Sequence, residues 1–335
     1  MTPRSPIVVS MGDPAGIGPE IILKARAELG ASIPLVALGD PGVFASTAAR
    51  LGLPGPAIVD APDAQLPGDR LAVLATPHTC SAPVTPGLPD AAHARAITSA
   101  IETGVALCRA GKASALVTAP ISKAVLYEAG FSFPGHTEYL AELTADAPVE
   151  GPRGPAMMLS GGGLRVVLAT IHLSLRDALA ALTAERIAGI ARLTHHALIR
   201  DFGIAAPRLA LAGLNPHAGE GGALGREEIE IVNPAAAALR AEGIDITDAL
   251  PPDTMFHAEA RAQYDAAVCL YHDQGLIPVK TLDFHGGVNI TLGLPIVRTS
   301  PDHGTAFAIA GQGVARADSL IAAIRQAAEI AEHRG

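Results

Sequence analysis

The sequence is poor in aromatic residues and has no excess of positive charge. Its 335 residues include no tryptophan, aromatic residues make up 3% of the chain, and the formal net charge is −9. A nucleic-acid-binding protein presents a basic face, and single-strand binders also stack bases on aromatic rings. Both shortages argue against a nucleic-acid partner.

Cysteines and long apolar runs are also scarce. Cys80, Cys108 and Cys269 are widely spaced and form no CxxC pair, which favours a reducing compartment over a disulfide framework. No apolar run approaches the ~18 residues of a membrane span. The first apolar run ends at Gly12-Asp13-Pro14, too soon for a signal peptide. These absences predict a cytoplasmic protein with no membrane partner.

Short apolar runs alternate with longer amphipathic segments along the whole chain. The runs begin near residues 7, 34, 115, 164, 208 and 265, and residues 184–198 show apolar positions at helical spacing. This alternation predicts an α/β fold with a largely parallel sheet. The length suits about two domains. No clear linker separates them, and the proline-rich residues 76–90 are expected to form a loop within one domain.

The first motif is MGDPAGIGPEI, residues 11–21, which follows a predicted strand and opens a predicted helix. Phosphate-binding loops often lie at this position, between the end of a strand and the N-terminus of a helix. The motif is neither GxGxxG nor GxxxxGK[ST], however. The alternative is a turn whose glycines supply only tight geometry.

The second motif is FPGHTEYLAELT, residues 133–144, which places His136 and Thr137 at a predicted helix N-terminus. Backbone N–H groups at such a terminus attract anions, and both side chains could add donors. Alternatively, Thr137 caps the helix with Glu138 in its first turn.

Three histidines, His172, His217 and His272, each follow an apolar run and are expected at the carboxyl end of a strand. Ligand sites of open α/β sheets gather at those ends. Three imidazoles could form an open metal site, with Asp273 orienting one of them. Their spacing matches no local metal motif, so ordinary capping or core histidines remain the alternative.

The segment of residues 271–315 carries few charges. Lys280, Asn289 and Arg298 could converge there on an acidic small molecule, since arginine binds carboxylates or phosphates through two hydrogen bonds and lysine acts as a point charge. The alternative is that each is a solvated surface residue.

Seven motifs in one order resemble the 4-hydroxythreonine-4-phosphate dehydrogenase family, which serves pyridoxal phosphate biosynthesis, over essentially the whole chain. They are MGDPAGIGPE, GHTEYLAEL, ATIHLSLRDAL, LNPHAGEGG, YHDQGL, GVNITLGLP and RTSPDHGTAF. The resemblance implies that His172, His217 and His272 bind a divalent metal. It implies that the substrate is bound by His136, Thr137, Lys280, Asn289 and Arg298. It also implies a homodimer whose active site is shared between subunits.

The stretch DHGTAFAIAGQGVARADSLIAAI is similar to a loop of isocitrate and isopropylmalate dehydrogenases that holds the adenosine end of the nicotinamide cofactor. His303, Gly304, Thr305 and Ala306 keep the pattern, and Phe307 departs from it. The likeness implies a two-domain, three-layer α/β/α fold with the active site in the interdomain cleft. It places residues 1–120 and 300–335 in a discontinuous cofactor-side domain, and residues 121–299 in a middle domain with the metal ligands and the dimer interface.

Together these resemblances imply that NAD or NADP oxidises 4-phosphooxy-L-threonine at C3, giving a β-keto acid, 2-amino-3-oxo-4-phosphooxybutanoate, that decarboxylates to 3-amino-2-oxopropyl phosphate. Zinc or cobalt suits imidazole ligands better than magnesium, although all three are candidates. Asp253 and Asp273 are candidate bases. Two rival functions remain: a dehydrogenase of another four-carbon phosphorylated acid such as 4-phosphoerythronate, and a non-redox metal-dependent sugar-phosphate-binding protein.

Overall fold

A computed structural model describes residues 5–63 and 68–335, which divide into two compact units. Unit 1 comprises residues 1–147 and 295–332, and unit 2 comprises residues 148–294 and 333–335. The two units are defined by contacts within the chain, so they do not show which unit binds the cofactor or the metal. The expected cofactor-side and middle domains, with boundaries at 120 and 300, therefore stay a prediction.

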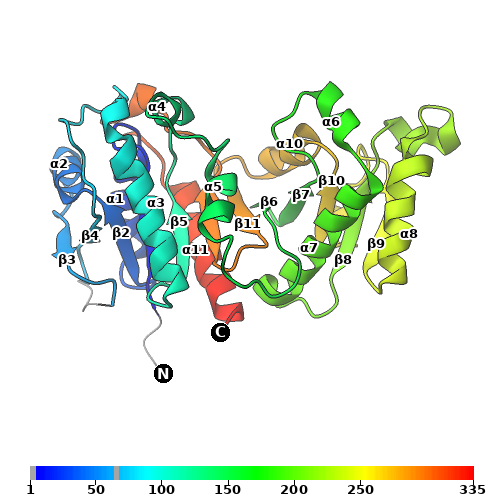
Figure 1. The fold of residues 1–335 in the computed structure, drawn as a ribbon, viewed down its shortest axis with the longest axis horizontal. Helices are drawn as coiled ribbons and strands as arrows, with labels where there is room; N and C mark the ends of the chain where they lie inside the picture. Colours follow the sequence, from blue (N-terminus) through cyan, green and yellow to red (C-terminus); the bar gives the residue numbers. More distant parts are fainter. Residues whose placement is uncertain (1–4, 64–67) are drawn as a thin grey trace. The chain divides into compact units, whose positions relative to one another are not determined.

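Unit 1 is built on parallel strands in the order β3-β4-β2-β1-β5-β12 (Figure 1). The strands are β1 (Ile7–Ser10), β2 (Leu35–Gly39), β3 (Ala57–Val59), β4 (Ala72–Ala75), β5 (Ala115–Thr118) and β12 (Arg298–Pro301). The helices are α1 (Gly18–Leu29), α2 (Pro41–Leu51), α3 (Ala94–Arg109), α4 (Lys123–Glu128), α5 (His136–Leu143) and α11 (Asp318–His333), of which His333 falls in unit 2.

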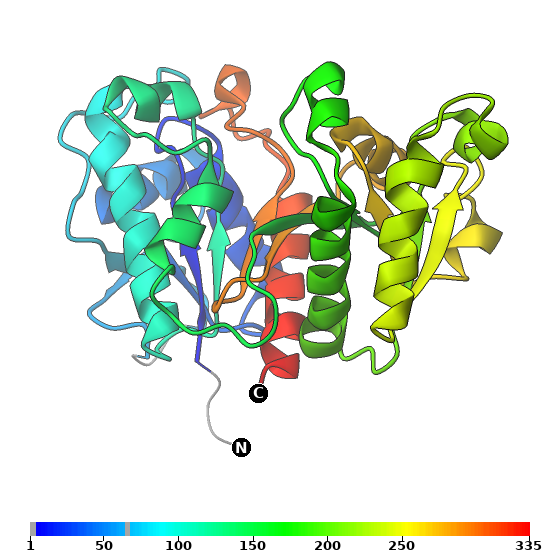
Figure 2. The same ribbon diagram turned by 45° about the vertical axis from the view of Figure 1, so that its right-hand side comes forward.

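Helices cover both faces of the unit 1 sheet. Leu116 of β5 points at Gly104 of α3, while Thr299 of β12 donates its hydroxyl to the Ala323 carbonyl of α11 at 2.8 Å. Thr299 is paired with Val117, and neighbouring residues of a strand point to opposite faces. Helices α3 and α11 therefore lie on opposite sides, which gives this unit three layers. Figure 2 shows α3, in cyan, lying in front of the strands.

Unit 2 has the strand order β11-β6-β7-β10-β8-β9. Its strands are β6 (Ala156–Gly161), β7 (Leu164–Leu168), β8 (Arg208–Ala212), β9 (Asp245–Leu250), β10 (Ala266–Cys269) and β11 (Val288–Leu292). Its helices are α6 (Leu175–Ala181), α7 (Ala184–Phe202), α8 (Asn233–Ala241), α9 (Ala258–Arg261) and α10 (His272–Leu282), with short turns η2 (Pro216–Gly222) and η3 (Glu228–Val232). The strands β7, β10, β8 and β9 are parallel, and β6 is antiparallel to both its neighbours.

The predicted α/β class and largely parallel sheets are confirmed. All six apolar runs form strands, residues 184–202 form the longest helix, and residues 76–90 lie outside regular helices and strands within unit 1. Residues Leu276 and Val279 of α10 pack into an apolar cluster with Leu159, Val166 and Cys269 on the unit 2 sheet. Within residues 5–63 and 68–335, no helix is long and apolar enough to cross a membrane.

Candidate active site

The three predicted metal ligands follow three neighbouring parallel strands of unit 2. His172 lies in the turn after β7, His217 lies in η2 after β8, and His272 is the first residue of α10, after β10. His172 and His272 therefore come after their strands, not at the strand ends. Because β7, β10 and β8 are adjacent and parallel, all three turns leave the same edge of the sheet.

Buried hydrogen bonds join these turns to one another. The Thr170 hydroxyl donates to the Leu270 carbonyl at 2.7 Å, which links the ends of β7 and β10. The Gln274 side chain accepts from the Leu270 N–H at 2.7 Å and donates to the Gly213 carbonyl at 2.6 Å, which links β10 to β8. Sequence reasoning did not single out Gln274, although it belongs to the YHDQGL motif. A buried amide that satisfies two backbone groups fixes the spacing of the turns.

His172 and His272 are brought together by this arrangement. Their ring centroids lie 5.7 Å apart with an interplanar angle of 42°. Two imidazoles with nitrogens ~2 Å from one tetrahedral ion have centroids roughly 5 Å apart, so this pair fits a shared cation.

Asp273 contacts the His272 ring. Its Oδ1 lies 2.7 Å from His272 Nδ1. A proton held on Nδ1 by the carboxylate leaves the Nε2 lone pair for a metal, an arrangement common among ligating histidines. The donor set thus fits a transition-metal ion, and the geometry agrees with the orienting role expected of Asp273.

His217 does not join the pair. Among the residues that the structure describes, no group of three or more His, Cys, Asp or Glu side chains is arranged to hold a metal. Two of the three histidines predicted to bind a metal therefore lie together, and the three-histidine site stays a prediction. His217 is exposed, with φ 53°, inside a run of five left-handed residues from His217 to Gly221. Left-handed non-glycine residues store strain and gather at functional sites.

Glu228 holds this left-handed run in place from η3. Its buried carboxylate accepts the backbone N–H groups of Leu214 and Asn215 at 2.8 and 2.7 Å, and the Asn215 side-chain amide at 2.9 Å. An ionised carboxylate that accepts several donors is a strong anchor. The turn carrying His217 is therefore fixed by an acidic residue that the sequence reasoning did not identify.

The other candidates in unit 2 are placed separately. Lys280 lies in the last turn of α10 and is half-buried, while Asn289 lies on β11 opposite Leu159. The Asn289 Oδ1 atom is buried and has no hydrogen-bond partner within the described part of the chain, which suits a ligand contact. Asp253 is exposed in the turn after β9. The base role of Asp253 or Asp273 stays a prediction.

In unit 1, His136 begins α5 as expected. The cap is Gly135, without a side-chain hydrogen bond, so the alternative in which Thr137 caps the helix is wrong: both His136 and Thr137 are helical. Burial, followed by the positive charges of Arg298 and Lys123, lowers the pKa of His136 well below its ordinary value of 6.5. The Nε2 atom of His136 is buried and, over the described residues, lacks a hydrogen-bond partner. A neutral imidazole at a helix N-terminus can donate to an anion.

Arg298 opens β12 and is buried, with 3% of its surface exposed. Its guanidinium donates to the Thr118 hydroxyl of β5 at 2.7 Å. Burial lowers the pKa of Arg298 to about 10, which leaves the group charged at neutral pH. It is therefore not a solvated surface residue, and a buried cation beside a neutral histidine suits an acidic ligand.

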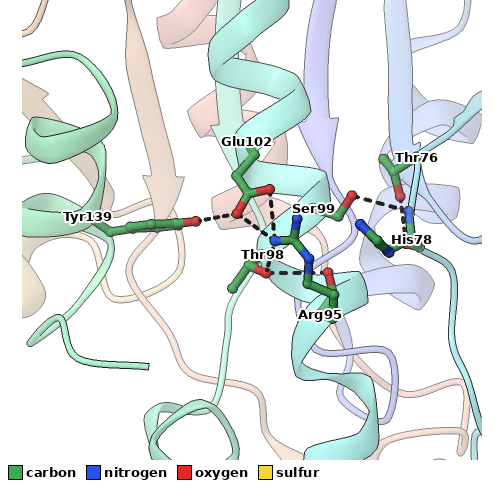
Figure 3. Close-up of polar contacts among 7 residues, drawn as sticks. All are labelled: Thr76, His78, Arg95, Thr98, Ser99, Glu102 and Tyr139. Carbon is green, nitrogen blue, oxygen red and sulfur yellow. Dashed lines mark hydrogen bonds and ion pairs between the residues drawn. The ribbon is translucent and has the colours of Figure 1, made fainter. Parts of the chain in front are cut away.

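The start of α5 is anchored on α3 (Figure 3). The Tyr139 hydroxyl donates to Glu102 at 2.7 Å, and the same carboxylate accepts two hydrogen bonds from Arg95, at 2.7 and 2.9 Å. Tyr139 also packs against the rings of Phe131 and Phe133, which both precede the Pro134-Gly135 turn before His136. The position of His136 and Thr137 is thereby fixed relative to the sheet that α3 covers.

The predicted cofactor loop follows β12. Ala306 has φ 45°, Gly304 is exposed with open space around its Cα, and a buried Nε2 of His303 has no partner in the part of unit 1 that is described. The loop therefore offers an open backbone and an unsatisfied ring nitrogen, which fit a polar cofactor group.

The MGDPAGIGPEI turn supports this loop. The Ile17 N–H donates to the Thr305 carbonyl at 3.0 Å, and a methyl group added at Gly16 would lie 3.0 Å from the same oxygen. Gly12, with φ 73°, packs against Pro120. The glycines supply tight geometry, and Gly16 lets the turn approach the 303–306 loop. Phosphate binding by this turn stays a prediction.

Comparisons with known proteins give one consistent result. The family described as pyridoxal phosphate biosynthetic protein PdxA matches residues 31–327. A 4-hydroxythreonine-4-phosphate dehydrogenase of Maricaulis maris is 68% identical over all of both chains, and that of Caulobacter vibrioides is 58% identical, again over all of both. The crystal structure of the Klebsiella pneumoniae enzyme of that name aligns with TM-score 0.87 at 42% identity, covering 98% of this chain and 99% of the other.

Proposed function

Because the chain belongs to the family of the pyridoxal phosphate biosynthetic protein PdxA, we propose that it is a dehydrogenase that oxidises 4-phosphooxy-L-threonine at C3. The product, 2-amino-3-oxo-4-phosphooxybutanoate, is a β-keto acid that loses CO₂ to give 3-amino-2-oxopropyl phosphate, a step of pyridoxal phosphate biosynthesis. The observation that carries the proposal is the full-length similarity to dehydrogenases of this substrate, and the paired histidines of unit 2 agree with it.

The proposed cofactors are NAD or NADP and a divalent ion, Zn²⁺, Co²⁺ or Mg²⁺. When bound, the ion supplies a Lewis acid for the C3 oxygen and the nicotinamide accepts the hydride. His172 and His272 would hold the ion, with His217 as the third ligand, and Asp273 would keep the His272 ring in the tautomer that presents Nε2. His303, Gly304, Thr305 and Ala306 would hold the cofactor.

The remaining site residues would bind and orient the substrate. His136, Thr137 and Arg298 in unit 1, together with Lys280 and Asn289 in unit 2, would hold its phosphate and carboxylate. Fixing both acidic ends of a four-carbon substrate positions C3 for reaction, and such positioning can lower a barrier by ~7–11 kcal/mol. Asp253 or Asp273 would accept the hydroxyl proton.

We propose that the active enzyme is a homodimer with a shared site. Exposed apolar side chains in unit 2 support this: Leu175 and Leu179 on α6 with Leu173 just before it, and Ile277 on α10 with Phe284 just after it. Leu173 is next to His172, and α10 begins at His272, so a second subunit covering this surface would reach the metal-binding residues. The cytoplasm is the proposed location, since Cys80, Cys108 and Cys269 form no disulfide in the described part of the chain.

The test is NADH formation by the purified protein. 4-Phosphooxy-L-threonine and 4-phosphoerythronate are compared, each after chelation and after adding back Zn²⁺, Co²⁺ or Mg²⁺. We expect turnover of the amino acid substrate that requires the ion. Faster turnover of 4-phosphoerythronate would favour a dehydrogenase of another four-carbon acid. Binding of the phosphorylated acids without NADH formation would favour the non-redox alternative.

A further inference from the structure

Lys123 is a basic residue of unit 1 that faces the start of α5. It is the first residue of α4, directly after Ser122, whose hydroxyl accepts from the Val125 N–H. This places it just beyond the carboxyl end of β5. A methyl group added at Gly135 would lie 3.4 Å from Cε and 3.5 Å from Nζ of Lys123. The lysine head group therefore lies against the cap of α5, where glycine leaves room for it.

Three basic groups meet at this place. Both Lys123 and Arg298 are close enough to His136 to act on its ring by their charge. Arg298 is buried, and its side chain donates to the neutral hydroxyl of Thr118. Like positive charges gathered in a partly buried place attract an anion. The cluster thus points to a negatively charged ligand.

Two further observations point the same way. The Nε2 atom of His136 is buried and, in the chain as described, has no hydrogen-bond partner. The cap of the eight-residue helix α5 is a glycine, so no capping side chain accepts from the N–H groups of the first turn. An anion at this end would accept from these donors and gain from the helix dipole.

We propose that Lys123 is a substrate-binding residue that, with Arg298 and His136, holds the phosphate group of the substrate. The inference rests on the proposed function for the identity of the substrate. A phosphate carries nearly two negative charges and three acceptor oxygens. Two permanent cations, a neutral imidazole and helix N–H groups match it better than they match a carboxylate, which carries a single charge.

Glu138 is the acidic group that also faces this place. Its Oε2 would lie 3.5 Å from a methyl group added at Gly135, like Nζ of Lys123. If Lys123 served only as a partner for Glu138, losing either charge would have the same effect. If Lys123 binds phosphate, losing the Glu138 charge removes a repulsion and leaves phosphate binding unchanged or tighter.

The first experiment measures binding of inorganic phosphate to the purified full chain by calorimetry, so it does not depend on turnover. We expect Lys123→Gln to weaken binding roughly tenfold or more, as for a lost charge-assisted contact. Lys123→Arg should retain most of the affinity. The control is Lys112→Gln, because Lys112 is exposed at the opposite end of β5. Equal weakening by Glu138→Gln and Lys123→Gln would overturn the proposal.

The second experiment compares turnover of 4-phosphooxy-L-threonine with that of 4-hydroxy-L-threonine, which lacks the phosphate. Lys123→Gln should raise KM for the phosphorylated compound about tenfold. It should leave kcat/KM for the other compound nearly unchanged. An equal loss on both compounds would refute a phosphate contact. Phosphate binding that depends on Lys123, without oxidation of either compound, would leave the phosphate site standing and refute the proposed function.

Discussion

The side-chain amide of Gln274 donates to the backbone carbonyl of Gly213 at 2.6 Å, across two neighbouring β-α turns. Gly213 follows β8 and leads to the turn that carries His217, whereas Gln274 lies two residues beyond His272. Since the same side chain accepts from Leu270, one buried residue sets the spacing between two of the turns that carry the predicted metal ligands.

Replacing Gln274 with leucine should destabilise the protein. The buried Leu270 N–H and Gly213 carbonyl would both lose their partner, at about 1–3 kcal/mol each. Denaturant unfolding measures the change, and metal titration should show weaker binding. Gln326→Leu is the control, since Gln326 is only half-buried on α11 and its amide donates to the Glu329 side chain, not to a buried backbone group. A Gln274 variant as stable as the control would mean that the bonds do not hold the turns.

Asp273→Asn should weaken metal binding about 10–100-fold, because an amide fixes the His272 tautomer less firmly than a carboxylate does. The measurement is Zn²⁺ or Co²⁺ affinity by competition with a chelator. Asp245→Asn, at an exposed position on β9, is the matched control. If both variants bind metal like the unmodified chain, Asp273 does not orient a ligand.

His217→Gly should raise the stability of the protein and abolish its metal-dependent activity. Glycine relieves the left-handed strain at φ 53°, which is worth about 1–2 kcal/mol, and so should raise the free energy of unfolding. If His217 is a ligand, the same change should abolish metal-dependent turnover. Ala218→Gly, at φ 51°, relieves similar strain and should keep activity. Full activity of the His217 variant would remove His217 from the site.

The folded protein should lose stability as pH falls below about 6.5, in part because of His136. Its folded pKa is lowered by burial and by Arg298 and Lys123, so between that value and 6.5 the unfolded chain binds more protons. Stability therefore rises with pH in this window. His136→Gln should flatten that part of the profile of unfolding free energy against pH. An unchanged slope would show that His136 titrates normally in the folded state.

Gly16→Ala should raise KM for NAD more than KM for the substrate. The new methyl group would press on the Thr305 carbonyl and shift the predicted cofactor loop. Gly55→Ala is the control, because nothing lies within 4 Å of a methyl group at Gly55. Steady-state kinetics with each reactant varied in turn distinguishes the two constants. Unchanged kinetics would place the cofactor elsewhere.

The sequence predicted the parallel strands β1, β2, β5, β7, β8 and β10, because a strand buried on both faces is a continuous apolar run bounded by glycine or proline. It missed the parallel strands β3, β4, β9 and β12, of which the first three are partly exposed. It did not reveal β6 and β11. The antiparallel pair β6–β7 does carry a turn signal, because Gly162 and Gly163, both with positive φ, form a two-residue hairpin turn between the strands. The β11 sequence, VNITL, interrupts its apolar residues with Asn289 and Thr291. The strand β11 forms because it pairs with β6, and that pairing is not visible in the local sequence.

At the site, sequence reasoning placed His136 at a helix start, as the structure does, but expected His172, His217 and His272 at strand ends, whereas they lie three to five residues beyond them. It could not have predicted the backbone of His217, Ala218 and Glu220, because non-glycine residues seldom adopt positive φ and nothing local demands it here. The cause lies in residues farther along the chain: Glu228 binds the start of the turn from η3. Such support appears only when the fold brings the segments together.

The hydrogen bond between Tyr139 and Glu102 bears on the ligand selectivity of the predicted site. It fastens the first turn of α5 to a helix that itself lies against β1, β2 and β5, so the donors at this turn stand ready before any ligand arrives. A preorganised binding site loses little conformational entropy when a ligand binds, and it accepts little variation in ligand shape. If the predicted ligand binds at this turn, its selectivity would come from the rigidity of the turn, because the chain would adjust little on binding.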